Sequence, residues 1–367
     1  MGMSNFLKAL AFAFSLWLVS ACSRVPDDPV VEEAEKMAEP EPEPPTPEEQ
    51  ALDLALGNIG DAFAGRVGIA VHDLQSGATV HFNGLGLFPQ QSVSKLWVAL
   101  TVLDQVDAGE LDLDDPVTIR SDDLTLFHQP IRNELRRRGG AFTTTVGDLM
   151  ERAITESDNT ANDALLRRVG GPEAVRRFLA RHDLGSIRFG PGEREMQSAI
   201  AGLEWRQSYA AGRSFYEARD KLPDDVRQAA FEGYLADPVD GAAPVAVAAA
   251  LARVARGEIV SGDSTGRLLD LLEQVKSGPN RLKGGVPAGW SVGHKTGTGQ
   301  VWGAEQSGYN DVAILTAPDG ERYAVAVMIA RTAQPVPARM GMMHEVVAAV
   351  VAYDAARDAL ASDERQD

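Results

Sequence analysis

The order of helical and strand-like patterns along the chain constrains its fold most strongly. Strand-like runs fall near both ends, at residues 67–71, 79–82, 290–294, 312–316 and 323–330. Amphipathic helical patterns over 48–63 and 338–360 lie outside these runs, and the pattern from about 95 to 275 is mostly helical. We therefore predict an α+β fold: a five-stranded antiparallel sheet completed by both ends of the chain and flanked by the terminal helices, with an all-helical lobe inserted in it.

The first 22 residues indicate export. Lys8 precedes an apolar run of 13 residues, 9–21, which is too short to span a bilayer as a helix. The only cysteine of the chain, Cys22, ends this run in the order Leu-Val-Ser-Ala-Cys, which resembles the lipobox of bacterial lipoproteins. The resemblance implies cleavage before Cys22 and lipidation of its sulfur, hence a periplasmic protein; Ser23, where an aspartate is absent, favours the outer membrane. An ordinary cleaved signal peptide is the alternative.

Residues 23–50 are predicted to form an acidic, proline-rich linker between the lipid and a catalytic domain spanning 51–362. Between Arg24 and Gln50 the chain has ten acidic and two basic residues and seven prolines, a composition that cannot bury much apolar area. The net charge of −18 and the absence of a basic stripe argue against nucleic acid as a partner. We expect a monomer that touches the membrane only through its lipid anchor.

Three short motifs carry residues suited to nucleophilic chemistry. They are Ser92-Val93-Ser94-Lys95, Ser157-Asp158-Asn159 and Lys295-Thr296-Gly297-Thr298-Gly299. In the first motif, a serine and a lysine three residues apart at the start of a helix share one face, so the amine can reach the hydroxyl and accept its proton. Each motif alone also fits a helix cap or a glycine-rich strand end. Only their combination favours an active site.

Taken together and in this order, the three motifs resemble the signature of class A β-lactamases and penicillin-binding proteins. The resemblance implies that Ser92 attacks the lactam carbonyl, Lys95 helps to deprotonate it, and Ser157 relays a proton to the leaving nitrogen. It also implies an oxyanion hole made by the backbone amides of Ser92 and Thr298. Residues expected to hold the substrate are Asn159, Lys295, Thr296, Gly297 and Thr298. Two lysines in one pocket are expected to lower each other's pKa, which favours a neutral Lys95.

A hydrolase of this type also needs a group that activates water. Glu193 and Gln197, in the order Glu-x-x-Met-Gln, resemble the class A element Glu-x-x-Leu-Asn. We therefore predict that Glu193 is the deacylation base and that Gln197 positions the water, although the extra methylene of glutamine requires its amide to fold back. A solvated charge run is the alternative.

Two features depart from the family pattern. Asn310 stands where many members carry an arginine for the substrate carboxylate, and Arg281 is a candidate replacement, with a surface salt bridge as its alternative. The segment 198–235 is longer than usual and holds six aromatic residues, which indicates packed structure that either rims the site or supports it from outside.

The sequence predicts neither a cofactor nor a metal site, because the six histidines are scattered. The expected activity is β-lactam hydrolysis, acting on a small-molecule β-lactam or peptidoglycan-like substrate. The alternatives are a D-alanyl-D-alanine peptidase or esterase on the same fold, and a penicillin-binding lipoprotein that stays acylated.

Overall fold

The computed structural model describes residues 44–363, with side chains through 359. A five-stranded antiparallel sheet has the strand order β2-β1-β11-β10-β7. Its strands are β1 (Arg66–Asp73), β2 (Thr79–Phe82), β7 (Ser291–Thr298), β10 (Tyr309–Thr316) and β11 (Arg322–Arg331). The predicted sheet, completed by both ends of the chain, is therefore confirmed. The predicted signal peptide, Cys22 and the linker up to residue 43 lie outside the described residues.

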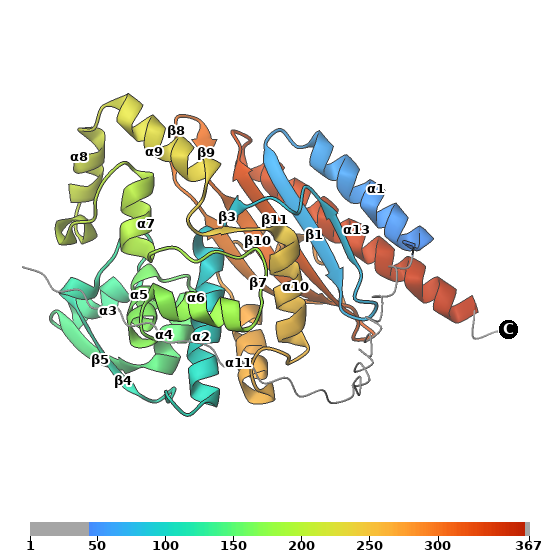
Figure 1. Cartoon of the computed structure of the whole chain (residues 1–367), viewed down its shortest axis with the longest axis horizontal. Helices are drawn as coiled ribbons and strands as arrows, with labels where there is room; N and C mark the ends of the chain where they lie inside the picture. Colours follow the sequence, from blue (N-terminus) through green and yellow to red (C-terminus); the bar gives the residue numbers. More distant parts are fainter. Residues whose placement is uncertain (1–43, 364–367) are drawn as a thin grey trace, which may run out of the picture. The chain divides into compact units, whose positions relative to one another are not determined.

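Helices cover both faces of this sheet. One face packs against α1 (Pro47–Ala62), α12 (Leu282–Gly285) and α13 (Val336–Asp363), with α1 and α13 side by side in Figure 1. The other face packs against α10 (Pro244–Ala255) and α11 (Gly262–Glu273). The central strands are consequently buried on both sides, which explains why the sequence of β1 and β11 is almost continuously apolar instead of alternating.

The helical lobe is built around α2 (Lys95–Asp107), whose residues from Lys95 to Leu103 are all buried. A helix that is apolar all round needs neighbours on every side, and the lobe supplies them. These neighbours are α4 (Val146–Thr155), α5 (Asn159–Arg168), α6 (Pro172–Arg181) and α11. Of the described helices, none is long and apolar enough to cross a membrane.

The structure also contains short strands that the sequence pattern did not predict. The region expected to be all-helical, about 95–275, holds β4 (Pro116–Arg120), β5 (Ala141–Thr145) and β6 (Gly241–Ala242), and β3 (Phe88–Pro89) lies just before it. Strands β4 and β5 pair antiparallel with helix α3 (Ile131–Arg137) between them in the chain, and β3 pairs with β6. They escape prediction because each is short and β4 and β5 bury little apolar surface, so no period-two pattern develops.

Two element boundaries also differ from the predicted ones. Helix α1 begins at Pro47, capped by Thr46 in a capping box with Glu49, so residues 47–50 belong to the helix and not to the predicted linker. Strand β7 continues to Thr298, so Lys295 and the residues after it lie within the strand, where the sequence suggested that the strand ends at His294.

The long segment after Gln197 forms packed helical structure, as its aromatic content predicts. Its elements are α7 (Glu193–Ile200), the 3-10 turn η3 (Gln207–Ala210), α8 (Ser214–Asp220) and α9 (Asp224–Ala236). Figure 1 shows α9 next to the small β8–β9 hairpin (Val301–Trp302 and Glu305–Gln306). Tyr209 and Phe215 form a small buried cluster with Leu126 and Ala201.

Candidate active site

Ser92 lies in the 3-10 turn η1 (Gln91–Ser94), which leads directly into α2. Lys95 is the first residue of that helix and is fully buried. Its ammonium Nζ donates to Ser92 Oγ at 2.6 Å, to Asn159 Oδ1 at 2.8 Å and to Glu193 Oε1 at 2.5 Å. A lysine has three N–H donors, so all three are used. The structure thus places the hydroxyl of residue 92 within direct reach of the amine at 95.

The second motif lies at the turn between α4 and α5. Asp158 caps α5 by accepting from the Ala161 N–H at 2.9 Å, and burial raises the pKa of its carboxyl. This cap fixes the two neighbours that face the site. Ser157 adopts a left-handed backbone conformation (φ +59°), and Asn159 donates from its amide to the Leu126 carbonyl at 2.9 Å.

Lys295, on β7, approaches Ser157 from the opposite side of the site. Its Nζ donates to Ser157 Oγ and to the Thr296 carbonyl, both at 3.0 Å. Burial, and next the positive charge of Lys95, hold the pKa of Lys295 well below its usual value. The expected mutual effect of the two lysines is therefore present at Lys295. That Lys95 is neutral stays a prediction.

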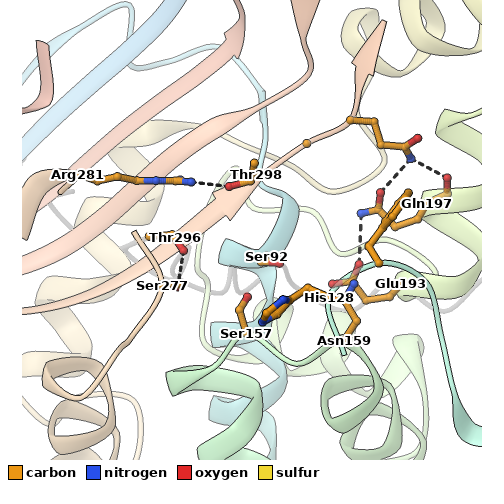
Figure 2. Close-up of a pocket in the computed structure, with 13 residues that line it drawn as sticks. Ser92, His128, Ser157, Asn159, Glu193, Gln197, Ser277, Arg281, Thr296 and Thr298 are labelled. Atoms are coloured by element: carbon orange, nitrogen blue, oxygen red, sulfur yellow. Dashed lines mark hydrogen bonds between the residues drawn. The ribbon is translucent and has the colours of Figure 1, made fainter. Parts of the chain in front are cut away.

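Glu193 and Gln197 lie one turn apart on α7, and both are buried. The Gln197 amide donates to Glu193 Oε2 at 3.3 Å, so the longer side chain does fold back to the carboxylate (Figure 2). The N–H of Glu193 donates to the carboxylate of Asp163 on α5 at 3.0 Å, which ties the start of α7 to the lobe. A solvated charge run is excluded, because Glu193 is only 3% exposed and forms an ion pair with Lys95.

Strand β7 forms the opposite wall, and Arg281 supports it from behind. The guanidinium donates to the carbonyls of Gly297 and Asn310 at 2.9 and 2.6 Å and to Thr298 Oγ1 at 2.5 Å. It also lies over the Tyr309 ring, 3.8 Å from the centroid. Arg281 is 7% exposed, which excludes the surface role left open by the sequence.

Asn310 and Gly297, whose carbonyls Arg281 contacts, hold the sheet close to the chain segment before Ser92. Asn310, which replaces the expected arginine, is buried and donates to the Pro89 and Gln90 carbonyls at 2.7 and 3.1 Å, so it joins β10 to the chain before Ser92. Gly297 has no room for a side chain, because a Cβ would lie 2.3 Å from the Gln90 carbonyl oxygen.

These elements enclose a cavity of about 410 Å³, shown in Figure 2. It is lined by Ser92, Phe127, His128, Ser157, Asn159, Glu193, Gln197, Ser277, Arg281, Thr296, Thr298, Gly299 and Gln300. Of the residues predicted from sequence, Lys95, Lys295 and Gly297 do not line the cavity. Instead, the two lysines contact the hydroxyls that do. Among the described residues, no group of three His, Cys, Asp or Glu side chains could hold a metal ion.

Ser277 and Gln300 are among the lining residues that sequence reasoning missed. Ser277 shares a hydrogen bond of 2.7 Å with Thr296, and Gln300 donates to the carbonyl and the amide oxygen of Gln197 at 2.7 and 3.0 Å. Gln300 directly follows the glycine-rich motif, which is the only signal that could have pointed to it; nothing in the sequence marks Ser277.

The aromatic segment supports the cavity from outside, which decides between the two roles left open for it. No lining residue comes from 198–235. Phe127, which does line the cavity, has a left-handed backbone (φ +59°) and packs edge-on against Phe215 of α8, with ring centroids 5.2 Å apart. The segment therefore holds one wall in place.

Comparisons with known proteins agree with this geometry. The family model described as "Beta-lactamase enzyme family" matches residues 51–353. β-Lactamase VEB-1 of Pseudomonas aeruginosa is 26% identical over 77% of this chain and 83% of its own. β-Lactamase L2 of Stenotrophomonas maltophilia is 31% identical over 72% of each. The crystal structure of a β-lactamase from Chitinophaga pinensis is 27% identical and aligns with a TM-score of 0.68 over 83% of this chain and 99% of its own. The chain therefore belongs to the class A β-lactamase family of serine hydrolases.

Proposed function

We propose that this enzyme hydrolyses the amide of β-lactams through an acyl-enzyme on Ser92. The observation that carries the proposal is the continuous contact from Ser92 through Lys95 to Glu193, at 2.6 and 2.5 Å, in a cavity that both Ser92 and Glu193 line. It joins a nucleophile to a carboxylate that can serve a second, hydrolytic step.

In acylation, Lys95 serves as a neutral amine, as predicted from the sequence. Ser92 Oγ then bonds to the lactam carbonyl carbon while its proton moves to Lys95. The developing negative charge on the carbonyl oxygen is held by the backbone amides of residues 92 and 298. When the carbon–nitrogen bond breaks, the nitrogen takes the proton of Ser157. Lys95 then passes the proton that it took from Ser92 to Ser157, so the proton lost by Ser92 is balanced by the one gained at the nitrogen.

The opposite wall is suited to a carboxylate-bearing substrate. Lys295 is fully buried, and its hydrogen bonds go to a hydroxyl and a carbonyl, so an anion near Ser157 would give it a counter-charge. Thr296 and Thr298 offer hydroxyls beside it, and Arg281 adds a second cation that contacts Thr298. Asn159 would bind the side-chain amide of the substrate.

In deacylation, Glu193 accepts a proton from a water that attacks the acyl carbon, and this proton passes through Lys95 to Ser92 Oγ as the ester bond breaks. The Gln197 amide, already in contact with the carboxylate, would position this water.

The proposal is tested by mixing the purified protein with a chromogenic cephalosporin and following product formation and intact mass. We expect turnover by the wild type and a long-lived acyl-enzyme in Glu193→Ala. Glu195→Ala is the matched control, because Glu195 lies on the same helix but is exposed, and it should behave as the wild type. A stable adduct already in the wild type would indicate a penicillin-binding protein without turnover. Absence of any adduct would point to a peptidase or esterase with another acyl substrate.

We also propose that the enzyme is a periplasmic monomer anchored by lipid at Cys22, most favourably in the outer membrane. The support is the apolar run before the only cysteine and the acidic, proline-rich segment after it. Labelling with radioactive palmitate should mark the wild type and not Cys22→Ser, and membrane fractionation should recover the label with the outer membrane. Sedimentation of the lipid-free domain tests the monomer.

A further inference from the structure

A buried chain of hydrogen bonds joins the inserted helix α9 to Glu193. Besides its contact with Glu193, the Gln197 amide donates to Gln91 Oε1 at 2.9 Å. Gln91 in turn donates from Nε2 to the hydroxyl of Tyr234 on α9 at 2.5 Å, and this hydroxyl donates to Asp240 Oδ1 at 2.9 Å. The chain thus runs Glu193, Gln197, Gln91, Tyr234, Asp240.

Every member of this chain is buried, with at most 8% of its surface exposed. From Gln197 onward each residue donates to the next one in the chain, and the last acceptor is the carboxylate of Asp240. Without the Tyr234 hydroxyl, the Gln91 amide would lose an acceptor and Asp240 a donor. Buried polar groups left without partners are costly, so the side chain of Gln91 would be expected to reorient.

Asp240 fixes the backbone of the same glutamine. Its Oδ2 accepts from the Gln91 N–H at 2.7 Å, and Gln91 has a left-handed backbone (φ +53°) that residues with side chains seldom adopt. Asp240 therefore holds the main chain of Gln91, and Tyr234 holds its side chain.

We propose that Tyr234 is a positioning residue for the hydrolytic step: it orients Gln91, which keeps the Gln197 amide against Glu193. The inference rests on the proposed function, in which Glu193 activates the water. It gives the 198–235 segment a part in hydrolysis although that segment contributes no residue to the cavity lining.

The geometry separates the two chemical steps. Acylation uses the contacts among Ser92, Lys95, Ser157 and Lys295, and none of these contacts includes Gln197 or Tyr234. Removing only the hydroxyl of Tyr234 also leaves the bond from Asp240 to the Gln91 backbone. The effect should therefore fall on deacylation.

The test is Tyr234→Phe, with acylation and deacylation rates measured separately by stopped-flow and intact mass on a chromogenic cephalosporin. We expect deacylation to slow about tenfold to one-hundredfold, with accumulation of the acyl-enzyme, and acylation to stay within about threefold. Tyr209→Phe is the matched control: it removes the phenol hydroxyl of a buried tyrosine in the same segment, whose ring packs on Phe215 and Trp205. It should leave both rates unchanged.

A second variant keeps the inference testable if Tyr234→Phe does not fold. Gln91→Asn retains an amide and a residue that tolerates a left-handed backbone, but it is too short to bridge Tyr234 and Gln197. It should slow deacylation as Tyr234→Phe does, and the double variant should be no slower than the single ones. Equal loss in both steps, unchanged deacylation or additive effects would overturn the inference. Failure of the proposed function would appear separately, as a Glu193→Ala enzyme that still deacylates.

Discussion

Asp163 provides a quantitative test of the electrostatics of this site, because its side chain is a second buried carboxylate beside Glu193. Burial, and next the charge of Glu193, raise the pKa of Asp163 from 3.8 to about 6. Between these two pH values the folded state binds more protons than the unfolded state. The free energy of unfolding must therefore fall as the pH rises through this window.

The size of the effect follows from the same interval. At about 1.4 kcal/mol per pKa unit, the rise to about 6 corresponds to about 3 kcal/mol of stability lost by neutral pH. Asp163→Asn keeps an oxygen that can accept from the Glu193 N–H but cannot ionise. Relative to the wild type, the variant should therefore gain about 3 kcal/mol between about pH 4 and about pH 7.

The assay is urea unfolding of both proteins across this pH range, and the quantity of interest is the difference between their free energies of unfolding. Asp240 is also buried with a pKa raised to about 6, but it is present in both proteins and its effect cancels in the difference. Asp53→Asn, which removes an exposed carboxyl from α1, is the control for the loss of one surface charge. A difference that stays flat with pH, or that falls, would refute the reasoning.

Three further outcomes are expected. Because the pKa of Lys295 is lowered, this group loses its charge as the pH rises, and kcat/KM should decline with it. In Lys295→Arg the decline should move to higher pH. A decline that does not move would contradict the assignment of this pH dependence to Lys295. Arg281→Met should raise KM about tenfold for substrates with a carboxylate, since the loss of one charge-assisted hydrogen bond has about this effect. For the methyl esters of these substrates KM should rise much less. An equal rise in KM for both would give Arg281 a purely structural role. Phe215→Ala should lower the free energy of unfolding by about 3 to 5 kcal/mol and loosen Phe127. Tyr216 is 38% exposed, so Tyr216→Ala should lower the free energy of unfolding much less. Urea titration distinguishes the two variants.

The sheet and the motifs could be predicted because each depends on local sequence. The runs that became β1 and β11 are apolar because helices cover both faces of the sheet, and that requirement is visible without coordinates. Likewise Ser92 and Lys95 share one helical face because of their spacing alone. The paired strands β4 and β5 could not be predicted, because they are half-exposed and carry no periodic apolar pattern.

The residue types that can perform the chemistry are visible in the sequence, since a nucleophile and its base need specific side chains and a close backbone approach needs a glycine. How remote residues cooperate depends on the folded structure. Arg281 reaches Thr298, and Tyr234 reaches Gln91 across 143 positions of the chain, because packing brings α12, α9 and the sheet together. Such contacts depend on three-dimensional distance and on the need to satisfy buried polar groups, and neither leaves a spacing pattern in the sequence.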